Sequence, residues 1–267
     1  MTLPLSIWIL LGASALCCAV GFKQYVYFIS IGYGFAIAGC GIAMLIIFHG
    51  EFSWGTLAAC ILFIIYGCRL AAFLLHREFQ TSSYNKHMKG EIKSGDSMGF
   101  GIKLMLWISC AILYVLMVAP VFYRLHNGGG TDALLVIGLI FMAGGIVLET
   151  SSDVSKNLQK KANGGNFCSK GLFAFVRCPN YLGELVLWSG VFLSGITSYC
   201  CAGQWIVAIL GYIGIIYVMF SGARRLELRQ NRNYGSDPAY QKYVKSVPIM
   251  IPFIPLYSVE KYKFLVL

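Results

Sequence analysis

Long apolar segments run from one end of the chain to the other, and they constrain its fold more than any other feature. A helix needs about 20 mostly apolar residues to cross the hydrocarbon core of a bilayer. The sequence predicts such spans at 4–22, 25–48, 54–75, 103–122, 133–150, 181–199 and 203–222. We therefore expect an all-α, polytopic membrane protein, a bundle of about seven transmembrane helices.

The low charge content supports this prediction. Only 12% of the 267 residues are charged and 58% are hydrophobic, whereas soluble domains carry about 25% charged residues. The chain has too few charges to cover a water-facing surface, which excludes an ordinary soluble enzyme, a disordered protein and a disulfide-stapled secreted domain. Because apolar segments continue throughout, residues 1–267 are predicted to form a single membrane domain.

The positive charges indicate an orientation. Lys and Arg outnumber Asp and Glu by 21 to 11, and in membrane proteins such an excess marks cytoplasmic loops. An outside N-terminus and a cytoplasmic C-terminus place nearly all of them inside, including Lys86, Lys89 and Lys93 after the third span. Only Arg124 falls outside. The basic charge therefore indicates membrane topology, and no nucleic-acid partner is expected.

Several common site motifs are absent from the sequence. The ten cysteines lie mostly in apolar runs, with no CxxC and no Cys/His set of zinc spacing, so no metal is predicted. All four histidines, including His87, precede the fifth span. No strand-associated GxGxxG and no Walker sequence is present, which excludes a Rossmann or P-loop cofactor domain.

Ionisable residues at membrane depth are functional candidates, because burying an unpaired charge there costs several kcal/mol. They are Arg69, Glu149, Asp153, Glu184 and Glu227. Glu149 and Asp153 are four residues apart, with Asn157 one step further, and Asn180 and Glu184 repeat this spacing. Residues four apart share a helix face, so these polar faces are expected to converge at the cytoplasmic leaflet.

A lysine-rich loop joins these two helices, with Lys156, Lys160, Lys161 and Lys170. Acids and amides inside a pocket with a cationic mouth suit a ligand that carries phosphates. The alternative is that the acids pair with Arg69 and the loop lysines and only hold the bundle together.

Three stretches together resemble the steroid 5α-reductase family. They are Glu149-Thr-Ser-Ser-Asp153, Arg177-Cys178-Pro179-Asn180-Tyr181-Leu182-Gly183-Glu184 and Trp188-Ser-Gly190. Upstream, Tyr66-x-x-Arg69 is similar to a span of these reductases, and Tyr240-x-x-Tyr243 with Ile251–Pro255 resembles their C-terminal end. The resemblance covers roughly 60–256 and is strongest over 149–190. A branch of uncharacterised membrane reductases in this family usually has histidine where this chain has Cys178.

The resemblance implies a seven-helix enzyme that reduces a carbon–carbon double bond of a steroid or other lipid with NADPH. Spans within 4–122 would form the substrate side, and 133–256 would bind the cofactor. Tyr66 would donate to a substrate carbonyl, supported by Arg69. The expected cofactor contacts are Glu149, Asp153, Asn157, Lys160, Asn180, Tyr181, Glu184, Arg224, Arg225 and Tyr240.

Two departures from the family pattern concern these roles. Glu149 stands where the steroid reductases have asparagine. These reductases also have a glutamate in an early span that partners the carbonyl-binding tyrosine, whereas the first two spans here contain no Asp or Glu. A lipid other than a 3-oxo steroid is therefore open as the substrate.

Two other functional classes remain open from the sequence. Methyltransferases of the isoprenylcysteine or phospholipid type, which use S-adenosylmethionine, resemble the chain around Arg177-x-Pro179-x-Tyr181. A non-enzymatic sterol-binding or transport protein is the third possibility. We expect a monomer with an apolar lipid or steroid partner, in the endoplasmic reticulum membrane of a eukaryote or the inner membrane of a bacterium.

Overall fold

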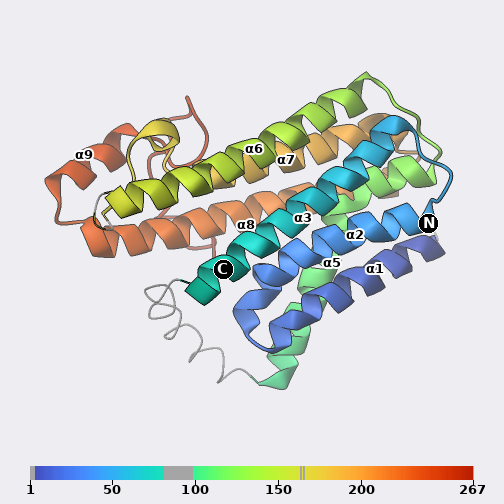
Figure 1. The fold of residues 1–267 in the computed structure, drawn as a ribbon, viewed down its shortest axis with the longest axis horizontal. Helices are drawn as coiled ribbons and strands as arrows, with labels where there is room; N and C mark the ends of the chain where they lie inside the picture. Colours follow the sequence, from blue (N-terminus) through green and yellow to red (C-terminus); the bar gives the residue numbers. More distant parts are fainter. Residues whose placement is uncertain (1–3, 81–98, 163, 165, 267) are drawn as a thin grey trace. The chain divides into compact units, whose positions relative to one another are not determined.

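The computed structural model describes residues 4–80, 99–162, 164 and 166–266. Lys86, Lys89, Lys93 and His87 lie outside these residues. Within them the regular structure is helical and no strand occurs, which confirms the all-α prediction. The α-helices (Figure 1) are α1 Leu5–Cys18, α2 Ile31–Ile47, α3 Trp54–Gln80, α5 Phe100–His126, α6 Ala133–Ala162, α7 Pro179–Gly195, α8 Ala202–Tyr234 and α9 Pro238–Ser246. Short 3₁₀ turns occupy Ala19–Phe22, Tyr25–Ile29, Gly171–Ala174 and Ile196–Ser198.

Each predicted span contains a helix. In the described residues, five helical segments are long and apolar enough to cross a membrane: Leu5–Phe22, Trp54–Arg77, Phe100–His126, Ala133–Ala162 and Ala202–Tyr234. Helices α2 and α7 have 17 residues each. The count of seven spans and the orientation of the termini remain predictions.

The second predicted span, 25–48, is divided in the structure. Its first turn is the 3₁₀ segment Tyr25–Ile29, and α2 begins only after Ser30, whose backbone leaves the helical region at φ −125° and ψ −94°. The Ser30 hydroxyl donates to the Val26 carbonyl at 2.8 Å and so satisfies a backbone group at the break. The residues on both sides of the break are apolar, so the hydrophobic pattern of the sequence does not reveal the change from 3₁₀ to α-helix.

The chain forms two compact units. Unit 1 comprises Met1–Leu139 and Val191–Tyr212, and unit 2 comprises Ile140–Gly190 and Ile213–Leu267. Helices α6, α7 and α8 each contribute residues to both units. The prediction of one membrane domain over 1–267 stays a prediction.

In unit 1, α2 packs between α1 and α3 (Figure 1). Two glycines set the spacing of α2 and α3, since a Cβ at Gly34 would lie 2.8 Å from the Gly67 carbonyl oxygen. A Cβ at Gly67 would likewise meet the backbone of Gly34. Small residues let membrane helices approach closely, so this glycine pair brings the two backbones together.

Unit 2 uses the same device between α6 and α7. A Cβ at Gly145 would lie 2.5 Å from both the Gly183 carbonyl oxygen and the Leu187 nitrogen. At Gly183 it would lie 2.7 Å from the Glu149 nitrogen. Residues further along α6 thus face residues earlier in α7. The two helices therefore run antiparallel, with their backbones in close contact.

Arg124, the one cation predicted to lie outside, is the centre of a polar cluster in unit 1. Its guanidinium donates to the carbonyls of Ser194 at 2.5 Å and Gly130 at 2.6 Å, to Thr197 and to the Asp132 carboxylate at 2.9 Å. The other Asp132 oxygen accepts from the Leu135 nitrogen at 2.8 Å and so caps the start of α6. This cluster therefore ties the end of α5 to the start of α6 and the end of α7.

Candidate active site

Three phenols meet in the apolar interior of unit 1. Tyr66 on α3 is fully buried, and its hydroxyl donates to the Tyr33 hydroxyl on α2 at 2.9 Å. The Tyr33 ring stacks on Tyr114 of α5 with centroids 5.1 Å apart, and the Tyr114 hydroxyl donates to the Phe28 carbonyl at 2.7 Å. The predicted carbonyl donor is thus hydrogen-bonded to a second phenol, whose ring stacks on a third.

Neither Tyr33 nor Tyr114 was among the residues predicted from the sequence. A signal for Tyr33 was present, because a tyrosine directly precedes a glycine at both 33–34 and 66–67. Gly34 and Gly67 are the pair that brings α2 and α3 together. The two tyrosines next to these glycines therefore lie at the same level and can meet.

Arg69 follows Tyr66 by one turn on α3, as predicted. Its guanidinium carbon lies 5.9 Å from the centroid of the Phe73 ring, and Arg77 lies at the same distance from that ring. Such cation–π contacts hold a guanidinium in an apolar environment. Support of Tyr66 by Arg69 remains a prediction.

In unit 2 the register of α6 and α7 groups four of the predicted cofactor residues. Glu149 lies beside Gly183, the residue that precedes Glu184 on α7. One turn further along α6, Asp153 is level with the first turn of α7, which carries Asn180. Glu149, Asp153 and Glu184 are all buried. The register thus places these residues at one level of α6 and α7, and the convergence of their side chains stays a prediction.

The remaining predicted cofactor residues of α6 and α7 lie nearby in the chain. Asn157 and Lys160 are exposed on the last turns of α6. The Tyr181 ring on α7 packs against α8, since a Cβ at Gly222 would lie 3.2 Å from its hydroxyl oxygen. Tyr181 is close enough to Glu184 and Arg225 for their charges to act on its phenol.

Arg224 and Tyr240 bind other parts of the chain. The Arg224 guanidinium donates to the carbonyls of Glu260 at 3.0 Å and Leu265 at 3.3 Å. The Tyr240 hydroxyl donates to the Asn231 side chain at 2.8 Å, and its ring packs against Phe167 with centroids 5.3 Å apart. The predicted cofactor role of Arg224 and Tyr240 would therefore require them to exchange these partners or to act alongside them.

A buried ion pair, which the sequence analysis did not predict as a pair, lies at the start of α7. The Arg177 Nη2 atom donates to Glu227 of α8 at 2.8 Å, with side chains only 1% and 3% exposed. Arg177 also donates to the Tyr257 carbonyl, and Glu227 accepts from the Val259 nitrogen at 2.9 Å. Together these contacts join α7, α8 and the C-terminal segment.

The residue at the family's histidine position is a neutral thiol. Cys178 is buried, and its backbone nitrogen donates to the Ile249 carbonyl at 2.9 Å. Burial raises the pKa of the Cys178 thiol to about 12, although the nearby Arg177 charge opposes this rise. A thiol with this pKa keeps its proton at neutral pH and is therefore a poor nucleophile. No cluster that could hold a metal ion occurs among the described residues.

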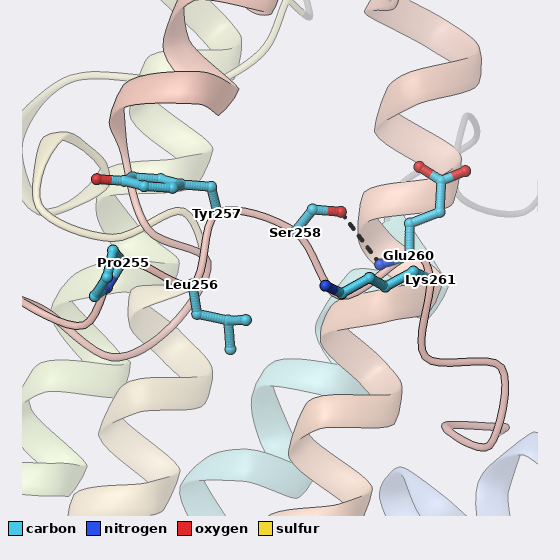
Figure 2. Close-up of a pocket in the computed structure, with 6 residues that line it drawn as sticks. All are labelled: Pro255, Leu256, Tyr257, Ser258, Glu260 and Lys261. Atoms are coloured by element: carbon cyan, nitrogen blue, oxygen red, sulfur yellow. Dashed lines mark hydrogen bonds between the residues drawn. The ribbon is translucent and has the colours of Figure 1, made fainter.

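A pocket of about 460 Å³ lies on the C-terminal segment (Figure 2). Its lining residues are Pro255, Leu256, Tyr257, Ser258, Glu260 and Lys261. Figure 2 shows the Lys261 ammonium and the Glu260 carboxylate pointing in different directions. None of the lining residues belongs to the predicted cofactor set, so this pocket is separate from that prediction.

The family described as "Protein of unknown function (DUF1295)" matches residues 22–247. The chain belongs to this family. Two curated relatives are steroid reductases, which confirms the resemblance inferred from the motifs. These relatives and the long apolar helices together support an integral, multi-pass membrane protein.

The first relative is 3-oxo-5-alpha-steroid 4-dehydrogenase 1 of Rattus norvegicus, 27% identical over 126 residues, which are 46% of this chain and 43% of the relative. The second is Steroid 5-alpha-reductase DET2 of Gossypium hirsutum, 29% identical over 118 residues, which are 43% of this chain and 40% of the relative. Each match thus spans less than half of the relative's length. No solved structure matches the chain.

Proposed function

We propose that this protein is a membrane-embedded, NADPH-dependent reductase of a carbon–carbon double bond conjugated to a carbonyl in a steroid or another lipid. The observation that carries the proposal is the buried Tyr66–Tyr33 hydroxyl pair in an apolar bundle. The similarity to two steroid reductases supports the same class of reaction.

The hydroxyl pair suits the charge that develops in this reaction. When hydride adds to the β-carbon of an enone, negative charge moves to the carbonyl oxygen. A preorganised donor at such an oxygen contributes roughly 3–4 kcal/mol to transition-state stabilisation. Tyr66 is the proposed donor. Tyr33 accepts its hydrogen bond in this structure, so Tyr33 positions the Tyr66 hydroxyl until a substrate carbonyl oxygen replaces Tyr33 as the acceptor.

The polar residues of unit 2 suit different parts of a dinucleotide. Buried carboxylates at Glu149, Asp153 and Glu184 can accept from ribose hydroxyls and a carboxamide. Asn180 is on the first turn of α7, and a helix N-terminus favours phosphate groups. The exposed Lys160 adds positive charge for a 2′-phosphate, which favours NADPH over NADH. Bound NADPH would supply the hydride.

The test is NADPH consumption by purified protein against 3-oxo-Δ4 steroids, sterol intermediates and enoyl lipids. Tyr66→Phe should lower turnover about 100-fold or more and leave NADPH affinity nearly unchanged. Tyr257→Phe, at an exposed tyrosine of unit 2, is the matched control. An equal loss of turnover and NADPH affinity in Tyr66→Phe would contradict the assignment.

Glu184→Gln tests the cofactor side separately. It should weaken NADPH binding, because an amide accepts hydroxyl hydrogen bonds less strongly than a carboxylate. Glu51→Gln, at an exposed acid of unit 1 that lies outside the predicted cofactor set, should leave binding unchanged. Thermal stabilisation by S-adenosylmethionine and none by NADPH would instead favour a methyltransferase.

A further inference from the structure

Residues 255–266, the C-terminal strap, lie along one face of α8. The Tyr217 hydroxyl donates to the carbonyls of Phe264 at 2.9 Å and Val266 at 3.2 Å. Two turns further along α8, Arg224 donates to the carbonyls of Glu260 and Leu265. Two turns beyond Arg224, Asn231 donates to the Glu260 carboxylate at 2.9 Å. Residues 217, 224 and 231 are seven apart, so they share a helix face.

These contacts fix the direction of the strap. Its start is level with the charged end of α8, where Glu227 accepts from the Val259 nitrogen. Its last residues are level with Tyr217, seven residues before the first charged residue of α8, Arg224. Seven residues of helix rise about 10 Å. The strap therefore returns from the charged end toward the uncharged, membrane-spanning part of α8.

Along this path the exposed side chains of the strap change from lysines to apolar residues. Val259 and Leu265 are buried and anchor the strap to unit 2. Phe264 and Val266 are 68% and 67% exposed beside the apolar part of α8. Lys261 and Lys263 are exposed closer to the charged end. Lysines with their ammonium groups at the headgroups and aromatic residues at the edge of the hydrocarbon are typical of a membrane interface.

We propose that the C-terminal strap is an interfacial membrane anchor, in which Phe264 and Val266 contact lipid hydrocarbon while Lys261 and Lys263 reach the lipid headgroups. The lipid contact is continuous with that of α8, to which the strap is bound. Exposing these two side chains to water would cost free energy in proportion to their apolar area, and lipid contact removes that cost. This proposal does not depend on the reductase activity.

The test places a fluorine probe at each end of the strap. Trifluoromethylphenylalanine replaces Phe264 or, as the matched control at the charged end, Tyr257, which is also exposed. Each full-length protein is reconstituted in nanodiscs of phosphatidylcholine and phosphatidylglycerol. Dissolved oxygen, which concentrates in hydrocarbon, should relax the probe at 264 several-fold more than the probe at 257. A water-soluble gadolinium chelate should act in the reverse order.

Equal or greater chelate access at 264 than at 257 would overturn the anchor. A second variant tests the strap contact itself. Tyr217→Phe removes the hydroxyl that binds the Phe264 and Val266 backbone, so the probe at 264 should lose part of its protection from the chelate. Ser258→Ala, on the exposed part of the strap, should change nothing at 264. No change with Tyr217→Phe would contradict the strap register.

Discussion

Units 1 and 2 use the same packing device to assemble different chemistry. In unit 1, Gly34 and Gly67 bring together two helices whose adjacent residues are neutral tyrosines. In unit 2, Gly145 and Gly183 bring together two helices whose adjacent residues include buried carboxylates. A close glycine contact therefore determines where the two helices meet, while the neighbouring residue types determine whether tyrosines or acidic residues lie at that level.

The ion pairs of the two units provide the strongest test of this difference. Glu227→Gln in unit 2 leaves the Arg177 charge buried without its counter-ion, and breaking a buried pair in this way costs about 3–5 kcal/mol of stability. Asp132→Asn in unit 1 should cost less, because the Asp132 side chain is 38% exposed and the buried Arg124 keeps two carbonyl partners. Thermal unfolding in detergent measures both, and equal losses would contradict the comparison.

The glycine contacts rank next. Gly145→Val in unit 2 inserts side-chain atoms against the α7 backbone, and overpacking of this kind costs about 1–3 kcal/mol. Gly144→Val is the matched control, because a Cβ at the neighbouring Gly144 has nothing within 4 Å. In unit 1, Gly67→Val should lower stability by an amount similar to that of Gly145→Val in unit 2. The same thermal measurement applies, and similar stability of the 144 and 145 variants would exclude the close contact.

A smaller effect is expected for the neutral hydrogen bond of unit 1. Tyr33→Phe removes the acceptor of the Tyr66 hydroxyl at constant ring size, and one neutral hydrogen bond contributes about 0.5–1.5 kcal/mol. If Tyr33 positions Tyr66, turnover should fall by roughly 10-fold or less, with KM for NADPH unchanged. Tyr257→Phe again serves as the control. A loss as large as that of Tyr66→Phe would mean that Tyr33 contacts the substrate directly.

The smallest effect concerns two thiols, one from each unit. Burial holds the pKa of the unit 2 thiol Cys178 at about 12, so it carries its proton at pH 8 and should resist N-ethylmaleimide. Cys200 of unit 1 is exposed and should react. Mass spectrometry of the folded protein measures both sites. Rapid labelling of Cys178 would show that the start of α7 opens to water.

Helical structure and membrane class were readable from the sequence, since both depend on how many apolar residues follow one another. The i,i+4 spacing of Glu149 with Asp153 and of Asn180 with Glu184 also predicted correctly which residues share a face, because that spacing is a local property of a helix. The break at Ser30 was not predicted, as both sides of it are equally apolar.

Contacts between residues far apart in the chain could not be predicted from the sequence. The Tyr66–Tyr33 bond, the Arg177–Glu227 pair and the strap contacts of Tyr217 join residues 33, 50 and 47 positions apart. The sequence alone determined that the chain is an apolar, helical membrane protein with its acids on particular helix faces. Only the tertiary structure decided which faces meet, because that choice depends on backbone approach at a few glycines and on the burial of each charge beside its counter-ion.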